Sequence, residues 1–197
     1  MLSEAQIERY ARHILLREVG GVGQERLLAA EVRIDGLSSV GIWAAHYLAL
    51  AGVGRLVLVD PRPIPAGGLP PLLPPALAGS ARDVSAVAAL GAHNPDAKAV
   101  VGEPEPKRDG GTILKPAGAN LSLVARAAGE ASFVGWADAP PCARCIPSGG
   151  AAPEAAALAG SLAASRVLAF LLFGEVERGI ARIESGREEA LAPCPHR

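Results

Sequence analysis

The sequence predicts a Rossmann-like, doubly wound α/β fold, with a mostly parallel sheet and helices on both faces. Three observations lead to it: a short strand at residues 31–35 enters a turn that begins at Gly36, a helix-length segment follows, and a second apolar strand at 56–59 ends at Asp60. Two strands around one helix form a right-handed β-α-β unit, which binds nucleotides beyond the carboxyl ends of its strands.

The remaining elements alternate along the chain. Ser3 is a candidate N-cap for a first helix, and Gly20-Gly21-Val22-Gly23 is expected to end that region. Residues 61–75 hold seven prolines and two glycines, which predicts an irregular loop. Helices are expected at residues 3–16, 24–30, 40–51, 79–90, 121–128 and 155–173. Strands are expected at residues 31–35, 56–59, 99–101, 112–114, 132–136 and 180–183.

The bulk properties indicate one domain of residues 1–197, with a helical extension at 1–30 and a C-terminal part at 140–197 that carries a C-x-x-C pair. A net charge of −1 and a pI of about 6.4 argue against a nucleic-acid partner. The longest apolar run, residues 155–174, contains Arg166, so a buried helix or a subunit contact is favoured over a membrane span. A polar first segment and only three cysteines favour a cytoplasmic protein.

The turn after the first strand keeps part of a G-x-G-x-x-G pattern. Gly36 stands at the first position, where a tight turn is needed, and Gly41 at the last, where the helix packs on the strand. Ser38 takes the middle position, where a side chain intrudes on the backbone N–H groups that approach phosphate. The scaffold of a nucleotide site is therefore predicted, with altered ligand chemistry.

Several motifs, in order, resemble the MoeB/ThiF/HesA family, whose members are similar to ubiquitin-activating enzymes. The matching segments run from the N-terminus to the C-terminus: Arg9-Tyr10-Ala11-Arg12-His13, Gly23-Gln24-Glu25-Arg26-Leu27, Leu48-Ala49-Leu50-Ala51-Gly52-Val53-Gly54, Leu58-Val59-Asp60, Asn94-Pro95, Pro141-Cys142-Ala143-Arg144-Cys145, Gly160-Ser161-Leu162-Ala163-Ala164 and Cys194-Pro195.

The resemblance implies that ATP and Mg²⁺ are used to adenylate the C-terminal Gly-Gly carboxylate of a ubiquitin-like sulfur carrier. It places Asp60 at the ribose hydroxyls and Arg82 at the position of a phosphate-binding lysine. It makes Arg12 the arginine that crosses a dimer interface to the partner's ATP. The expected nucleotide-binding residues are therefore Gly36, Gly41, Asp60, Arg82 and, in trans, Arg12.

The chain departs from the family pattern at most positions that would act on its own nucleotide. The second acidic residue is replaced by Arg62, the phosphate-binding Asn and Arg fall on Gly68 and Pro71, and the metal-binding aspartate falls on Ala119. A different register would bring in Asp109 or Asp138 instead.

The resemblance also implies a structural zinc site made of two cysteine pairs. Cys142 and Cys145 match the first pair, whereas the second is reduced to Cys194, with His196 as a candidate fourth ligand. The alternative is a set of free thiols.

Arg12, which acts in trans, is retained while most groups acting in cis are lost. The sequence therefore favours a catalytically impaired partner subunit or scaffold in a sulfur-carrier system, as a homodimer or as a heterodimer with an active paralogue. The alternatives are an active sulfur-carrier adenylyltransferase and, from a different class, an NAD-binding Rossmann oxidoreductase.

Overall fold

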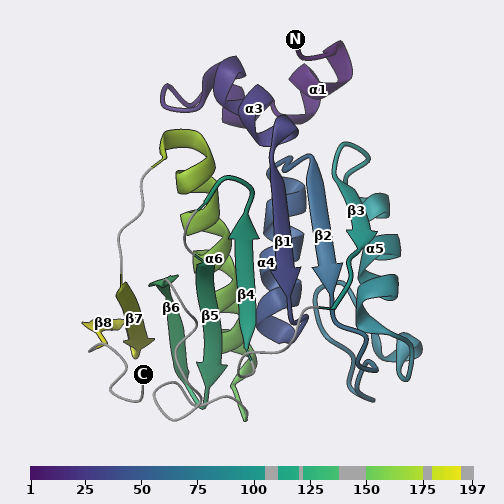
Figure 1. Ribbon diagram of the computed structural model, residues 1–197, viewed down its shortest axis with the longest axis vertical. Helices are drawn as coiled ribbons and strands as arrows, with labels where there is room; N and C mark the ends of the chain where they lie inside the picture. The colour runs from purple at the N-terminus through teal and green to yellow at the C-terminus, as the bar shows by residue number, and fades with distance from the viewer. Residues whose placement is uncertain (105–110, 120–121, 138–149, 175–178, 192–197) are drawn as a thin grey trace.

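The sheet and its helices are seen in a computed structural model that describes residues 1–104, 111–119, 122–137, 150–174 and 179–191. Eight strands form one sheet in the order β3-β2-β1-β4-β5-β6-β7-β8 (Figure 1). The strands are β1 (Glu31–Asp35), β2 (Arg55–Val59), β3 (Lys98–Val101), β4 (Thr112–Pro116), β5 (Ser122–Ala128), β6 (Ala131–Ala137), β7 (Gly179–Glu184) and β8 (Arg187–Ala190). The helices are α1 (Glu4–Arg9), α2 (Ala11–Ile14), α3 (Gly20–Ala29), α4 (Ser39–Leu50), α5 (Arg82–His93) and α6 (Pro153–Phe173), with a 3₁₀ turn, η1, at Pro75–Leu77.

The Rossmann-like α/β class is confirmed, but the strand directions differ from the expectation. Strands β1, β2 and β3 run parallel, as the β-α-β prediction requires. From β4 to β8 each strand is antiparallel to its neighbour, so the expectation of a mostly parallel sheet is wrong. The physical reason is connection length: β5 and β6 are joined through Gly129 and Glu130 alone, and such a short link can join only antiparallel strands.

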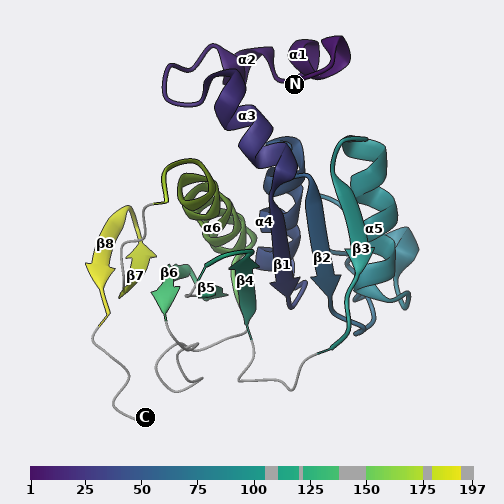
Figure 2. The same cartoon turned by 45° about the horizontal axis from the view of Figure 1, so that its top comes forward.

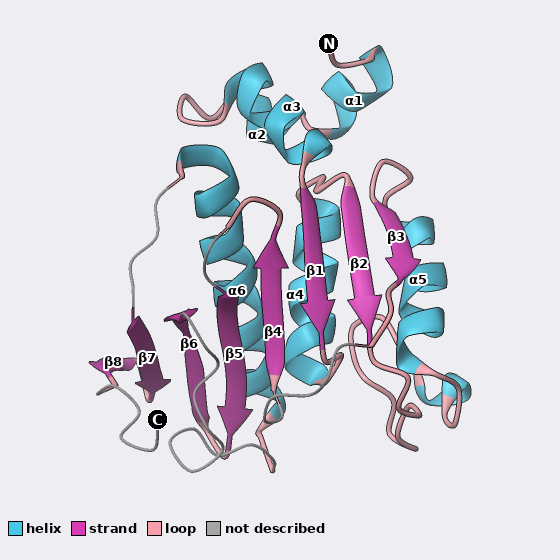
Figure 3. Cartoon of the chain, viewed as in Figure 1, coloured by secondary structure: helices cyan, strands magenta, loops and turns pink. Residues whose placement is uncertain are grey.

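The helix layers also differ from the expected doubly wound arrangement. Helices α4, α5 and α6 lie on one face of the sheet in both views, not on its two faces (Figures 1 and 2). Helices α4 and α5 connect successive parallel strands, and crossovers of one hand place their helices on the same face. The three N-terminal helices lie beyond the end of the sheet at which β1 begins (Figure 3).

Three local expectations are wrong. Residues 122–128 form strand β5 rather than a helix, because a short apolar run fits either element and here it is paired with a strand on each side. The first helical segment is divided at Tyr10 into α1 and α2: Tyr10 leaves the helical backbone conformation, with φ −101° and ψ 16°, and its side chain is only 1% exposed. The segment Gly20-Gly21-Val22-Gly23 was expected to end the helical region, but it forms the first turn of α3. The interruption lies before it, between Ile14 and Gly20.

Several family-like residues near the N-terminus hold these helices to the core. The buried amide of Asn94 donates to the Tyr10 hydroxyl at 2.9 Å and to the Ala49 carbonyl at 2.7 Å. The Tyr10 hydroxyl in turn donates to Asp96, which also accepts from Arg9 at 2.6 Å. These contacts therefore hold the N-terminal helical segment against the body of the fold.

Helix α6 packs closely against α4 along a face of small residues. A Cβ at Gly160 would lie 2.5 Å from Cβ of Trp43 and 2.6 Å from the Val40 carbonyl oxygen, so only glycine permits this approach. Helix α6 is long and apolar enough to cross a membrane by length and composition alone. In this fold one face of the helix is buried, at Ala155, Ala156, Ala159, Gly160, Ala163, Ala164 and Val167.

We expect Gly160→Ala to lower the free energy of unfolding by about 1–3 kcal/mol, because the added methyl overpacks the contact with α4. Gly91→Ala is the matched control: Gly91 is also inside a helix, but nothing lies within 4 Å of the place that an added methyl group would take. There the substitution should stabilise the protein by about 0.5–1 kcal/mol through helix propensity. Urea unfolding of both variants tests this, and equal effects would contradict it.

Candidate functional site

The candidate site lies at the carboxyl ends of β1 and β2, where the chain leaves β1 through Gly36. Gly36 has φ +91°, and a Cβ there would lie 2.4 Å from the Gly111 carbonyl oxygen. Its N–H donates to the Val59 carbonyl at 2.9 Å, which joins the turn to the end of β2. The first glycine of the pattern is therefore required by the tight turn.

The last glycine of the pattern sets the distance between α4 and the turn. A Cβ at Gly41 would lie 2.2 Å from the Gly36 carbonyl oxygen and 3.0 Å from Oγ1 of Thr112. The Thr112 hydroxyl donates to that same Gly36 carbonyl at 2.9 Å, so β4 supports the turn. The close packing that the pattern predicts for Gly41 is present in the fold.

Ser38, at the middle position of the pattern, directs its side chain to β4. Its Oγ lies 3.1 Å from Oγ1 of Thr112. Although Ser38 is the N-cap of α4, its side chain makes no capping hydrogen bond. The hydroxyl is thus bound to the sheet instead of capping the helix N–H groups.

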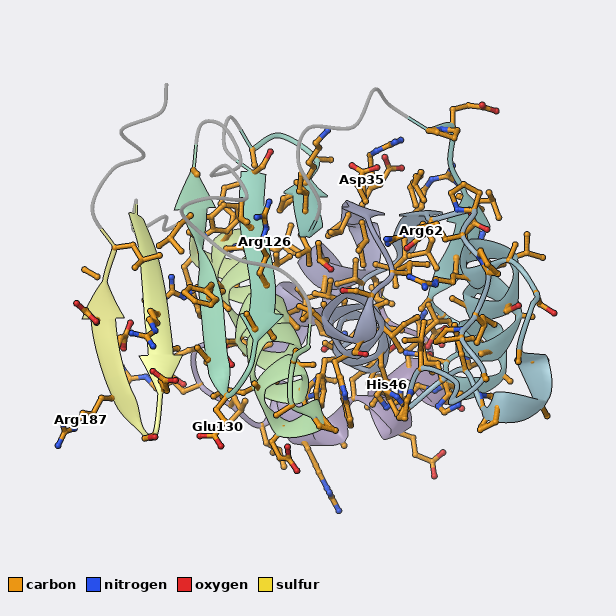
Figure 4. The ribbon with its side chains drawn as sticks, turned by 90° about the horizontal axis from the view of Figure 1, so that it is seen from below. Asp35, His46, Arg62, Arg126, Glu130 and Arg187 are labelled. Atoms are coloured by element: carbon orange, nitrogen blue, oxygen red, sulfur yellow. The ribbon has the colours of Figure 1, made fainter. Side chains whose placement is uncertain are left out.

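Asp60 is the charged centre of the site, and its side chain is only 2% exposed. Its carboxylate accepts from the Leu37 N–H at 2.7 Å. Arg62 binds it with two guanidinium nitrogens, Nε at 2.7 Å to Oδ1 and Nη2 at 2.6 Å to Oδ2. Figure 4 views the molecule from this end, with Arg62 labelled close to Asp35 at the end of β1 and His46 on the helix layer away from both.

Helix α5 closes the site from the other side. Arg82 Nη1 lies 3.4 Å from Oδ2 of Asp60, and its Nε donates to the Pro63 carbonyl at 3.0 Å. The buried Asp83 accepts from the Asp60 N–H at 3.1 Å, which holds the start of α5 to the end of β2. Two guanidinium groups therefore converge on one buried carboxylate.

These contacts determine the protonation of the pair. Burial by itself raises the pKa of Asp60, but the hydrogen bonds and charge of Arg62, the Leu37 N–H and the charge of Arg82 outweigh it and hold the pKa below its ordinary value of 3.8. The hydrogen bond to Asp60 raises the pKa of Arg62. Asp60 is therefore an anion, paired with cations, near neutral pH.

The structure brings together four of the five residues expected to bind nucleotide. Gly36, Gly41, Asp60 and Arg82 all lie at this end of the sheet. Arg12 is exposed on α2, at the opposite end, where β1 begins (Figure 2). Their roles in ligand binding stay predictions.

The parts played by Arg62 and Thr112 were not predicted from the sequence. Arg62 stood out only as a replacement for an acidic residue, although its position two residues after a strand-end aspartate was a signal that the two side chains could pair. Thr112 gave no signal, because its contact with Gly36 joins segments that are far apart in the sequence.

The expected metal sites fall largely outside what the structure describes. Cys142, Cys145, Cys194 and His196 lie outside the described residues, so the zinc site stays a prediction. Within the described ranges, no three His, Cys, Asp or Glu side chains gather as metal ligands. Ala119, at the position of the magnesium-binding aspartate, is itself described and offers no carboxylate.

The parallel β1-α4-β2 unit, the glycine turn and the strand-end carboxylate define a Rossmann-like fold, the class in which nucleotide sites are commonly built at this edge of the sheet. A comparison with known families makes this specific. The model of the ThiF family matches residues 10–108, and the chain belongs to that family.

Individual relatives agree with this assignment. The adenylyltransferase and sulfurtransferase MOCS3 of Bos taurus is 48% identical over 91 residues, which is 45% of this chain and 20% of that protein. The SAMP-activating enzyme E1 of Haloferax volcanii is 49% identical over 59 residues, 30% of this chain and 22% of that protein. The chain thus spans about a fifth of the length of these curated relatives.

Among solved structures, E. coli MccB with AMPCPP and MccA superposes with a TM-score of 0.73 at 15% identity. The match covers 95% of this chain and 72% of that one. At this identity the likeness concerns the fold alone.

The residues at the site fit a bound nucleotide only in part. The turn and the helix N-terminus have the expected backbone form. The Asp60 oxygens, however, already accept from Leu37, Arg62 and Arg82, so a ribose hydroxyl finds no free acceptor on this carboxylate while Arg62 is in place.

We expect the stability of the protein to fall on acidification below about pH 4, partly through Asp60. Its pKa is lower in the folded than in the unfolded state, so the stabilisation is present above the unfolded pKa and is lost as the pH falls through the folded pKa. Urea unfolding between pH 2 and 5 should show a flatter dependence for Asp60→Asn. Asp96, whose pKa is lowered by Arg9, Gln6 and Tyr10 against the opposing effect of burial, should account for part of the remainder. An unchanged slope in Asp60→Asn would contradict the assignment.

Proposed function

We propose that this chain acts in a ubiquitin-like sulfur-carrier system as a partner subunit or scaffold whose own adenylation activity is impaired. Membership of the ThiF family supports the system, since relatives are named as adenylyltransferases and as an activating enzyme. In this proposal the carrier and an active paralogue are the partners, and ATP bound by the paralogue is the nucleotide.

The observation that supports a role in trans is the separation of Arg12 from the chain's own candidate site. Arg12 belongs to α2, which lies beyond the end of the sheet at which β1 begins, and Asp60 directly follows β2 at the other end (Figure 3). Strands β1 and β2 between them are five residues long, or roughly 16 Å. At that distance an exposed Arg12 can act on a neighbouring molecule but not on the chain's own candidate site.

The positions that would act in cis support the same proposal. Gly68 and Pro71 supply neither an amide nor a guanidinium to a triphosphate, and Ala119 supplies no metal ligand. Ser38 adds a side chain where the family pattern has a glycine. Arg62 places a positive charge where the pattern has an acidic residue. Loss of a single group that stabilises the transition state typically costs about 100- to 1,000-fold in kcat.

The chain alone should release no pyrophosphate above background when mixed with ATP, Mg²⁺ and a carrier ending in Gly-Gly. Pyrophosphate release at a rate proportional to the amount of this chain would reject the proposal in favour of the alternative, an active adenylyltransferase. A preparation with Asp60→Asn separates true turnover from a contaminating enzyme.

In a mixture with an active ThiF-family paralogue, the chain should raise the rate of pyrophosphate release. The substitution Arg12→Ala should make that increase about 100-fold smaller. Arg17→Ala is the matched control, because Arg17 is also an exposed arginine close to α2. Equal effects of the two substitutions would show that Arg12 has no special role in trans.

A further inference from the structure

Arg62 stands two residues after Asp60 and covers the carboxylate of that residue. Its Nε and Nη2 atoms make a two-point contact with Oδ1 and Oδ2, the geometry that gives guanidinium–carboxylate pairs their strength. The Arg62 backbone N–H also donates to Oδ1 at 3.2 Å. The Asp60–Arg62 ion pair thus lies at the carboxyl end of β2, and both of its members come from residues 60–62.

The acceptor capacity of Asp60 is filled. A carboxylate has about four lone-pair sites on its two oxygens. Oδ1 accepts twice from Arg62, while Oδ2 accepts from Arg62, from the Leu37 N–H at 2.7 Å and from Arg82 at 3.4 Å. Another donor, such as a sugar hydroxyl, can bind Asp60 only by displacing one of these groups.

Arg62 is the donor that can leave. Its side chain is 47% exposed, whereas that of Arg82 is 15% exposed and is also held by the Pro63 carbonyl. The Leu37 donor is backbone in the turn. Without the Arg62 side chain, Asp60 would still face the Arg82 cation and the backbone N–H groups of Leu37 and residue 62, so the carboxylate would not be left as an isolated buried charge.

We propose that the Arg62 guanidinium competes with the ribose cis-diol of a nucleotide for the Asp60 carboxylate, and so determines how weakly this chain binds nucleotides. In β-α-β nucleotide sites the acid at the end of the second strand accepts from ribose hydroxyls, and here an internal cation holds that acid. The inference rests on the proposed function, because it explains the impaired nucleotide site through one identifiable side chain.

The test is calorimetric titration of the full chain with Mg²⁺-ATP and with its 2′,3′-dideoxy analogue. We expect Arg62→Ala to bind ATP at least tenfold more tightly than the unsubstituted chain, which corresponds to about 1.4 kcal/mol. The dideoxy analogue, which lacks the competing hydroxyls, should gain less than threefold. Arg62→Gln, which is uncharged but keeps an amide donor, should show an intermediate gain and serves if Arg62→Ala does not fold.

Arg55→Ala is the matched control. Arg55 is also a half-exposed arginine paired with a carboxylate, Glu31 at 2.7 Å, but it lies at the amino end of β2 away from the site. It should leave both affinities unchanged. Adding Asp60→Asn to Arg62→Ala should abolish the gain for ATP.

Equal affinity in the unsubstituted chain and in both Arg62 variants would overturn the inference, as would equal gains for ATP and the dideoxy analogue. The parallel pyrophosphate assay keeps the proposed function separate. Absence of binding in every folded variant, with no turnover, would reject the role of Arg62 and leave the proposed function standing. Turnover by the unsubstituted chain would reject the proposed function, while the ratio of affinities would still decide the role of Arg62.

Discussion

The buried carboxylate of Asp60 is the interaction on which the rest of this site depends. It accepts hydrogen bonds from the Leu37 N–H in the turn after β1, from the Arg62 side chain just beyond β2, and from the Arg82 side chain at the start of α5. A charge excluded from water in this way must be compensated by donors in fixed positions. The arrangement that stabilises the end of the β-α-β unit therefore also occupies the oxygens of this carboxylate.

Close approach of backbones fixes the surroundings of that carboxylate. Gly41 allows α4 to pack closely against the turn at Gly36, and Gly160 allows α6 to pack closely against α4. These two glycines therefore set the position of the α4 N-terminus relative to the turn and to α6. Thr112 adds a hydrogen bond from β4 to the carbonyl of Gly36. These contacts hold the turn, α4 and β4 together as one scaffold in this ThiF-family protein.

Prediction from the sequence succeeded where the pattern is local. The strand at 31–35, the turn at Gly36, the helix after it and the strand ending at Asp60 form one continuous unit, whose glycine spacing and apolar runs are set by the backbone itself. It failed at residues 122–128, because an apolar run of that length suits a helix or a strand, and pairing with β4 and β6 decides between them. It also overestimated parallel pairing, because hairpin links were not recognised beyond β4.

The sequence by itself determined the class of the protein, the β-α-β unit and the gathering of Gly36, Gly41, Asp60 and Arg82, since consecutive parallel strands bring their carboxyl ends to one edge. Only the tertiary structure decided how that edge is occupied. The support from Thr112 and the distance of Arg12 from Asp60 depend on contacts between segments whose separation no local pattern encodes. Arg62 lies only two residues from Asp60, but the burial of that carboxylate in the fold decides that the two side chains pair. A charge pattern fixes which groups are available, whereas burial and packing determine which of them bind one another.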